Sequence, residues 1–472
     1  MLKRKIEETL IQWKENPNHN PLVIKGIRQC GKTFIVQKFA KDHYEHVVYI
    51  NFLLEADKST AFLGAKDVDT IILGLSTLMP EAKFVPGKTC IILDEIQDCP
   101  DARTSLKSFK TDGRFDVIAT GSLLGVKGYG EKKKKEKNKK LGKNSIPVGY
   151  ETIISMYPLD FEEFLWANGI RPVAIEAVRA CFREEKPVPE GVHYAFKQLF
   201  YRYAVVGGLP AAVNTFLETN HMGEVAGMYK SIIDEYEDDM VKYADDADKA
   251  HIRECFESIP AQLAKENKKF QYSTIKKGGR ASQYAGSLQW LEDAGFIHRC
   301  YNTFQTRLPL KGNAKEDVFK VYPTDIGILM AMLDPGTRAD VLQGKLGGYK
   351  GAIYEGIMAD FLHKKGQGLY YFHKDSGLEL DFLVRQKGEC VPLEVKATTS
   401  KAKSMKNAID NKPVYHLNQG IKFGDYNVGR DGAILTVPSY MGFFLEFEGV
   451  EDIDLPVLDI DEVNRLGKEM LR

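Results

Sequence analysis

Apolar runs of strand length alternate with longer segments of helical patterning in the amino-terminal part of the chain. The runs are 21–26, 46–53, 90–93 and 114–125, and they are rich in Val, Ile and Leu. The run 90–93 is continuously apolar, which is typical of a parallel strand that is covered on both faces. Strands that alternate with helices predict an α/β fold with a parallel sheet, whose ligands bind at the carboxyl ends of the strands.

The segment that follows the first predicted strand matches a phosphate-binding loop. Residues 26–33 read Gly-Ile-Arg-Gln-Cys-Gly-Lys-Thr, which fits G-x-x-x-x-G-K-[ST] in full, between a predicted strand and a predicted helix. Gly26 and Gly31 let backbone N–H groups turn toward phosphate oxygens. We expect Lys32 to reach the β- and γ-phosphates and Thr33 to hold Mg²⁺. The alternative is a glycine turn with a surface lysine.

Polar residues follow the next predicted strands where a bound triphosphate would lie. Asp94 and Glu95 directly follow the run 90–93. We expect Asp94 to bind the metal through its water shell and Glu95 to polarise the attacking water. Thr120 and Ser122 end a further strand and are candidates for contact with the γ-phosphate, although a plain turn explains them equally well. These motifs predict a P-loop ATPase core with ATP and Mg²⁺ as cofactors.

Composition narrows the function classes only slightly. The chain has 472 residues, which suggests two to four domains, and its Lys+Arg and Asp+Glu totals are both 65, so the net charge indicates no class of partner. The seven cysteines are scattered without a Cys-x-x-Cys pair, which argues against a disulfide framework or a zinc site. The chain has no apolar signal region at its start and no membrane-length apolar run, so we expect a cytoplasmic protein without a membrane span.

Helical patterning continues beyond the predicted core, for which we expect residues 1–165. Residues 166–250 are patterned as helices, with breaks at 185–193 and at 205–213. We expect this region to form a lid over the nucleotide site. Residues 131–144 form a lysine-rich block, which predicts a solvated loop inserted in the core; contact with nucleic acid is the alternative.

Residues 251–335 combine amphipathic helices with a β-hairpin, which predicts a winged helix–turn–helix. Its helix 280–293 would face a DNA major groove, with Lys276, Lys277 and Arg280 near phosphates. DNA is therefore an expected partner. The alternative is a winged helix that only packs against neighbouring domains.

Five stretches resemble the AAA-type ATPase family with a C-terminal DUF4143 region (AAA_14/DUF4143). The last two make the resemblance specific; the five are IKGIRQCGKT, IILDEIQDCP, IATGSLLG, MYPLDFEEFLWA (156–167) and VVGGLPAAV (205–213). The resemblance implies an AAA-type core, helical and winged-helix parts, and a nuclease-like end. AAA-type enzymes often complete a neighbour's site with an arginine in a homo-oligomer, and Arg103, Arg114 and Arg202 are candidates. Arg28, inside the loop, is a further candidate for a charge stabiliser.

The region 345–472 carries a second acidic constellation. Alternation along 378–384 places Glu379 and Asp381 on one face, and a later strand places Glu394 and Lys396 on one face. If the two strands pair, these acids and the lysine converge. The pattern is the acid followed by E-x-K of PD-(D/E)XK nucleases, with Leu380 in the place of the proline.

Two carboxylates on adjacent strands can hold one Mg²⁺ beside a scissile phosphate, so Asp381 and Glu394 are the predicted metal ligands. Lys396 would orient the metal-bound water. By resemblance, Glu355 on the preceding predicted helix is the additional acid, and Glu379 is a further contact or a rim residue. Two alternatives stay open: a solvated strand edge with an ion pair, and a nuclease fold that binds without cutting.

The hypothesis that accounts for most of these features is an ATPase coupled to a Mg²⁺-dependent nuclease-like domain that acts on nucleic acid. The second hypothesis is a nucleotide-controlled regulatory or interaction protein with a silent nuclease fold, whose winged helix docks DNA or a protein. A small-molecule kinase would account for the loop 26–33 alone and leaves the trailing domains unexplained.

Overall fold

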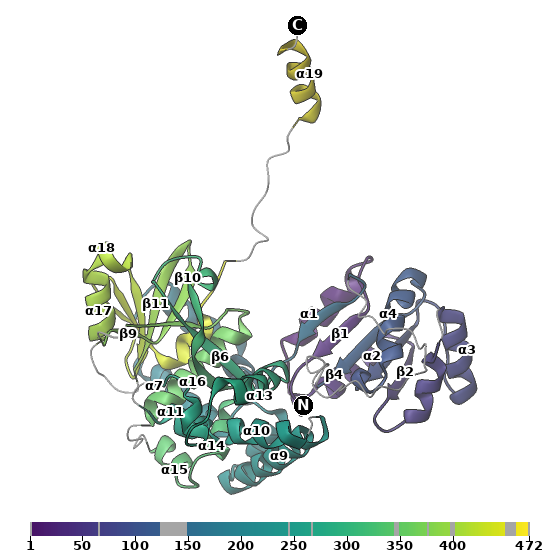
Figure 1. The fold of residues 1–472 in the computed structure, drawn as a ribbon, viewed down its shortest axis with the longest axis horizontal. Coiled ribbons are helices and arrows are strands. Elements are labelled where there is room, and N and C mark those ends of the chain that lie inside the picture. The colour runs from purple at the N-terminus through teal and green to yellow at the C-terminus, as the bar shows by residue number, and fades with distance from the viewer. Residues whose placement is uncertain are drawn as a thin grey trace.

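A five-stranded parallel sheet forms the amino-terminal lobe (Figure 1). The computed structural model describes residues 2–64, 67–122, 149–243, 246–265, 268–343, 349–374, 377–396, 402–448 and 459–470. The strand order is β2-β3-β4-β1-β5, all parallel, with the bounds β1 Leu22–Lys25, β2 His46–Asn51, β3 Thr89–Asp94, β4 Asp116–Gly121 and β5 Thr152–Ser155. The predicted α/β class with a P-loop-type sheet is confirmed. The fifth strand, β5, was not predicted.

Side-chain alternation along the strands gives the sheet two buried faces. Leu22 and Ile24 of β1 join one apolar cluster, whereas Val23 between them joins another. The helices around the sheet are α1 (Ile6–Glu15), α2 (Lys32–His43), α3 (Val68–Leu78) and α4 (Pro100–Asp112), with the 3₁₀ turns η1 (Ala56–Phe62) and η2 (Ile96–Asp98). Because β4 lies between β1 and β3, the loop after β1 faces the carboxyl ends of β4 and β3.

A helical region follows the sheet. Its helices are α5 (Phe161–Ala167), α6 (Pro172–Arg183), α7 (Glu190–Val206), α8 (Pro210–Thr219), α9 (Met222–Tyr243) and α10 (Asp246–Glu257). The predicted lysine-rich block 131–144 lies outside the described residues.

The segment predicted to be a winged helix shares a sheet with the carboxyl-terminal part of the chain. It contains α11 (Ile259–Leu263), α12 (Tyr272–Ile275), α13 (Ala281–Asp293), β6 (Ile297–Thr303), η3 (Lys311–Asn313), β7 (Ala314–Pro323), α14 (Ile326–Ala331) and α15 (Thr337–Leu342). The antiparallel hairpin β6–β7 continues through β8 (Tyr370–His373) to β9 (Glu379–Leu380) in the order β7-β6-β8-β9. Two strands of this sheet therefore come from the hairpin and two from the following region.

The carboxyl-terminal part is built around a buried helix and a mixed sheet. Helix α16 (Lys350–Lys364) is buried along most of its length. The sheet has the order β10-β11-β12-β14-β13. The bounds are β10 Phe382–Gln386, β11 Glu389–Val395, α17 Lys403–Asp410, α18 Lys412–Tyr415, β12 Gly420–Gly424, β13 Gly429–Asp431, β14 Ile434–Pro438, η4 Ser439–Phe444 and α19 Ile460–Met470.

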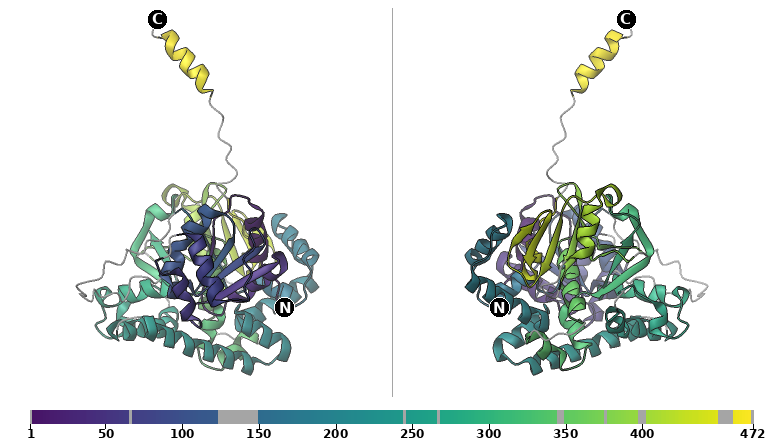
Figure 2. Two further views of the ribbon diagram at one scale, coloured as in Figure 1. Left: turned by 90° about the vertical axis from the view of Figure 1, so that its right-hand side faces the viewer. Right: turned by 90° about the vertical axis from the view of Figure 1, so that its left-hand side faces the viewer.

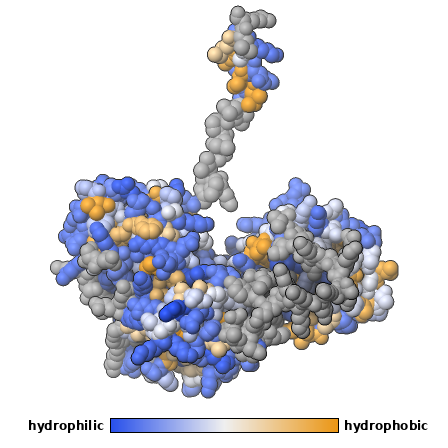
Figure 3. Space-filling model, viewed as in Figure 1, coloured by the Kyte–Doolittle hydropathy of each residue, from blue (hydrophilic) through white to orange (hydrophobic). Residues whose placement is uncertain are grey.

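The last helix, α19, stands away from the body of the chain (Figures 1 and 2). One of its faces is apolar and exposed, and it appears orange in the space-filling view (Figure 3); the residues are Ile460, Val463, Leu466 and Met470. Within the part of the chain that the structure describes, no helix is long and apolar enough to cross a membrane.

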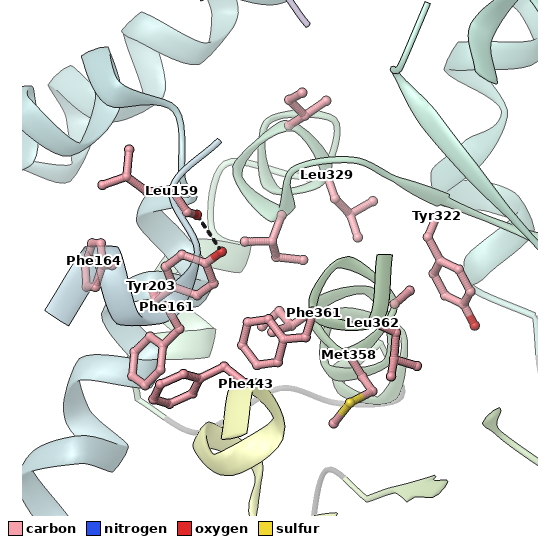
Figure 4. Packing of buried hydrophobic residues seen from close by; sticks show 14 of the residues in the cluster. Leu159, Phe161, Phe164, Tyr203, Tyr322, Leu329, Met358, Phe361, Leu362 and Phe443 are labelled. Carbon is pink, nitrogen blue, oxygen red and sulfur yellow. Dashed lines mark hydrogen bonds between the residues drawn. The ribbon is translucent and has the colours of Figure 1, made fainter. Parts of the chain in front are cut away.

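Among the described residues, one apolar cluster runs from the five-stranded parallel sheet into the carboxyl-terminal region. Figure 4 shows Phe161 and Phe164 of α5 beside Phe361 of α16 and Phe443 of η4. In the same view, the hydroxyl of Tyr203 donates to the carbonyl of Leu159 at 3.0 Å. The stretch 156–167 thus packs directly against the carboxyl-terminal region.

Candidate active site

The loop between β1 and α2 has the shape of a phosphate cradle. Gly31 adopts a φ of +96°, which favours glycine, and a Cβ on Gly26 would lie 2.1 Å from the carbonyl oxygen of Met156. The ammonium of Lys32 donates to the carbonyls of Gly26 at 2.8 Å and Ile27 at 2.9 Å. The charged group therefore lies within the curve of the loop, where a triphosphate would bind.

Asp94 is the centre of a hydrogen-bond network beside this loop. Its Oδ2 accepts from Thr33 at 2.9 Å, and Thr120 donates to its Oδ1. The structure thus brings together three predicted residues from α2, β3 and β4. Tyr49 and Asn51 also donate to Oδ2, at 2.7 and 3.3 Å.

Sequence reasoning missed Tyr49 and Asn51. Both lie on β2, two positions apart, and β2 pairs in parallel with β3. Their alternation in a predicted strand was the available signal, since residues two apart share a face. Burial raises the pKa of Tyr49 to about 12, so this hydroxyl remains a donor to the carboxylate at neutral pH.

Glu95 follows Asp94 in a left-handed conformation with a φ of 53°. This turn directs the chain out of β3, and the Glu95 side chain receives hydrogen bonds from Gln97 and, at 3.4 Å, from the hydroxyl of Ser122. Ser122 therefore contacts the second acid, whereas Thr120 contacts the first. The predicted pair at the end of β4 is positioned beside the predicted pair at the end of β3.

The residues present fit a magnesium-nucleotide. A hydroxyl and a carboxylate converge beside Lys32, and oxygen ligands of this kind suit Mg²⁺. The carboxylate is 2% exposed and takes hydrogen bonds on both oxygens, which fixes its orientation.

The helical region contacts the outer side of the loop. On α9, the hydroxyl of Tyr236 donates to the carbonyl of Arg28 at 3.0 Å, and Glu235 accepts from Gln29 at 2.6 Å. Arg4, which precedes α1, donates to the carbonyl of Cys30 at 3.0 Å. Three consecutive loop residues are thus bound from outside the sheet.

The three arginines considered for a neighbouring site differ in their surroundings. Arg103 is buried and pairs with Glu151 at 2.8 Å. Arg114 pairs with Asp112 at 2.7 Å and with Asp69 at 2.6 Å. Arg202 on α7 is exposed. Arg103 is therefore engaged inside its own chain.

A cavity of about 460 Å³ opens between the carboxyl edge of the sheet and the region from α13 onward. Gly26 and Ser122 line one side, and Arg299 and His298 line the other. Glu292 holds the guanidinium of Arg299. The nucleotide loop thus borders a space that the predicted winged helix also borders.

The predicted basic residues of the winged helix are exposed. Lys276, Lys277 and Arg280 lie between α12 and α13 on the surface. Tyr284 and Leu288 of α13 are buried, so the opposite face of this helix is the one turned to solvent.

The carboxyl-terminal acids are arranged differently from the expected continuous strand. The alternation predicts one strand over 378–384 with Glu379 and Asp381 on the same face. The prediction of one continuous strand was wrong, because β9 ends at Leu380 and β10 begins at Phe382 in a different sheet. β9 pairs with β8, whereas β10 pairs with β11. The residues before Asp381 therefore belong to one sheet and the residues after it to another. The Oδ2 of Asp381 accepts from the backbone of Val395 at 2.8 Å.

The antiparallel pairing of β10 with β11 brings Asp381 beside Glu394, as predicted. The register pairs Phe382 with Leu393, so the two acids lie at the next position along the ladder. Lys396 pairs with Glu394 at 2.5 Å. Burial, followed by the charges of Glu355 and Glu394, raises the pKa of Asp381 to about 8, so this acid is largely neutral at pH 7.

Glu355, on α16, is bound by residues from the hairpin region. Lys268 lies 2.6 Å from its Oε1, and Tyr322 donates to its Oε2 at 3.0 Å. Lys320 pairs with Glu379 at 2.7 Å. Burial raises the pKa of Glu355, but Lys320 and Lys268 outweigh burial and lower it, so this acid is ionised.

These lysines were not predicted, because they lie far from the acids in sequence. Among the described residues, no group of three or more His, Cys, Asp or Glu side chains is arranged to hold a metal ion. The acids meet ammonium groups instead. In this arrangement the carboxyl-terminal site does not fit Mg²⁺.

Comparisons with known protein families match three stretches of the chain. Family models match at residues 18–165 (AAA domain, AAA_14), 197–339 (domain of unknown function DUF8612) and 350–440 (domain of unknown function DUF4143). No curated protein matches the chain. Among solved structures, the chain is similar to the Walker-type ATPase PABY2304 of Pyrococcus abyssi, at 14% identity over 70% of this chain and 96% of that one, with a TM-score of 0.39.

Proposed function

The chain carries an AAA domain of the AAA_14 family and a DUF4143 region, and we propose on this premise that it binds and hydrolyses ATP with Mg²⁺ at residues 26–33. One observation carries the proposal. The Thr33 hydroxyl lies 2.9 Å from the buried Asp94 carboxylate, beside the ammonium of Lys32 within the loop. This is the donor set that a magnesium-triphosphate needs.

Each residue of the proposed site has a separate role in ATP hydrolysis. Lys32 exchanges its bonds to loop carbonyls for bonds to the β- and γ-phosphates. Thr33 and Asp94 would hold Mg²⁺, which neutralises charge on the phosphates when bound. Glu95 orients the attacking water, and Thr120 and Ser122 hold the two acids in position. The Lys32→Ala variant tests the proposal: ATP turnover should vanish, and turnover at the wild-type rate would overturn it.

We propose further that the nucleotide state reaches the carboxyl-terminal region through residues 156–167. Arg4 joins the loop to this stretch, since it donates to Cys30 and, at 2.6 Å, to the carbonyl of Tyr157. The backbone N–H of Leu159 donates to the carbonyl of Gly208 at 2.6 Å. The carbonyl of Leu159 accepts from the ammonium of Lys364 of α16 at 3.2 Å. A shift of the loop is thus transmitted through hydrogen bonds to α16, which carries Glu355.

Nucleic acid is the proposed target of this coupling. The exposed Lys276, Lys277 and Arg280 support contact with phosphates, and Asp381, Glu394 and Lys396 support a nuclease-like site. DNA binding should weaken steeply with salt, and neutralising the three basic residues should reduce the slope of log K against log salt by about 2–3. If the wild type cleaves nucleic acid under any condition, Lys396→Ala should abolish that cleavage and leave ATP turnover unchanged.

A second candidate is a nucleotide-controlled interaction protein with a silent nuclease fold. The observation that favours it is that Lys268 and Lys320 occupy the acid cluster. Binding of DNA that is insensitive to divalent metal, together with no cleavage of DNA or RNA under any metal, would select this candidate over the first.

A further inference from the structure

Two lysines from outside the nuclease-like region enter its acid cluster. The ammonium of Lys320, on β7, lies 2.7 Å from Glu379 Oε1 and 3.7 Å from Glu355 Oε2. The ammonium of Lys268 lies 2.6 Å from the other oxygen of Glu355. Glu355 is therefore bound on both oxygens by cations of the chain itself.

The path of Lys320 explains how it reaches the acids. β7 is the edge strand of the sheet β7-β6-β8-β9, and Glu379 lies on β9 at the opposite edge. The Lys320 side chain is 0% exposed, and its ammonium lies 4.7 Å from the ring centroid of Tyr371 on β8. The Lys320 side chain therefore extends from β7 along one face of the sheet, past the ring of Tyr371, to Glu379 on β9. Its burial and its contact with this ring fix its direction.

Charge balance in the cluster opposes a divalent cation. Four acids (Glu355, Glu379, Asp381 and Glu394) face three ammonium groups, those of Lys268, Lys320 and Lys396. Asp381 is largely neutral, so the three ammonium groups already balance the charge of the other acids. A divalent ion needs oxygens that converge without a competing cation, and ammonium groups at these distances repel it.

From this arrangement we infer that Lys268 and Lys320 occupy the place of the divalent cation and lock the acid cluster against the hairpin β6–β7. The cluster takes Mg²⁺ or Mn²⁺ only when these lysines are withdrawn or removed, and the loss of either one opens part of the site. The inference rests on the proposed function in one respect, which is the choice of a divalent metal ion as the cation that the acid cluster would bind. It makes the hairpin a control element of the carboxyl-terminal site, because the strand that carries Lys320 has to move before a metal can enter.

Counting bound Mn²⁺ by electron paramagnetic resonance on the full-length, nucleotide-free chain tests the lock. Wild type should bind no Mn²⁺ at the cluster. The Lys268→Met/Lys320→Met variant should gain one bound Mn²⁺ at the cluster, and adding Glu394→Gln should remove it. The matched control, Lys311→Met/Lys374→Met, changes two exposed lysines and should behave as wild type.

Two results would overturn the lock. One is a wild-type Mn²⁺ site that is lost on Glu394→Gln; the other is a double variant that gains no Mn²⁺ although its circular dichroism and ATP turnover match wild type. If the double variant does not fold, the single variant Lys268→Met is the test. It frees one oxygen of Glu355 and should therefore show measurable Mn²⁺ binding at the cluster, and the absence of such binding refutes the lock. A variant that gains Mn²⁺ but cleaves nothing rejects the nuclease proposal and leaves the lock intact.

Discussion

The guanidinium of Arg4 pairs with the carboxylate of Glu163 at 3.1 Å, with both side chains buried. The same guanidinium donates to Cys30 in the phosphate loop. Glu163 also closes a capping box with Asp160 at the start of α5. The pair therefore joins the nucleotide loop to the helix that packs against the carboxyl-terminal region.

Arg4→Met should lower the free energy of unfolding by about 3 kcal/mol, because it leaves a buried carboxylate unpaired. It should also raise the KM for ATP, since the loop loses a bond at Cys30. Urea unfolding and steady-state ATP turnover measure the two effects. Arg4→Met/Glu163→Gln should recover part of the stability. A loss of stability in the double variant that equals the sum of the losses in the two single variants would contradict coupling through this pair.

Glu95→Gln should separate ATP binding from hydrolysis. The amide keeps the size of the side chain but cannot polarise water, so kcat should fall about 100-fold or more while ATP affinity changes little. Fluorescent-nucleotide titration and phosphate release measure the two quantities. Glu81→Gln, at an exposed site, is the matched control. Unchanged kcat in Glu95→Gln would remove this residue from the mechanism.

Gly207→Ala should destabilise the chain by more than about 2 kcal/mol. Gly207 adopts φ 75° and ψ −169°, and a Cβ there would lie 2.1 Å from the hydroxyl of Tyr229. Gly227→Ala is the matched control, because this position on α9 has open space and Ala favours helix. In thermal unfolding, the melting temperature should therefore be lower than that of wild type for Gly207→Ala and higher for Gly227→Ala. Equal melting temperatures of the two variants would contradict the packing around Gly207.

Two stacked histidines predict a loss of stability in acid. The rings of His298 and His363 lie 3.6 Å apart, and burial lowers the pKa of both, that of His363 to about 4. The unfolded chain, with histidine pKa values of about 6.5, binds protons that the folded chain excludes. Stability from these groups is therefore complete above about pH 6.5 and falls as the pH drops toward 4.

Between pH 7.5 and pH 5, the free energy of unfolding of His363→Asn should fall less than that of wild type. The difference in slope against pH should correspond to up to about one bound proton. Urea midpoints at several pH values measure this difference. His221→Asn, at an exposed site, should follow the wild-type curve. Burial raises the pKa of Asp360 to about 7, which gives an opposite slope, but this contribution is present in every variant and cancels in the comparison. Parallel curves for His363→Asn and wild type would show that the histidine takes up its proton over the same pH range in the folded chain as in the unfolded chain.

Local sequence was enough to predict the geometry of the loop 26–33. The loop 26–33 is a continuous motif between a strand and a helix, and its geometry depends on its own glycines. Asp94 and Thr120 could be placed beside it, because parallel strands bring their carboxyl ends to one edge. Tyr49 had a signal in the alternation along its strand, but Arg4 had none, since no local pattern distinguishes a hydrogen-bonding arginine from a surface one.

The carboxyl-terminal cluster shows what the sequence by itself determined and what only the tertiary structure decided. The E-x-K triplet and the preceding acid were readable, because alternation along a strand is local. The change of sheets at Asp381 and the arrival of Lys268 and Lys320 were not, because they depend on which strands pair across distant segments. Local spacing thus determined which groups carry chemistry, whereas long-range strand pairing decided whether those groups face a metal or a lysine.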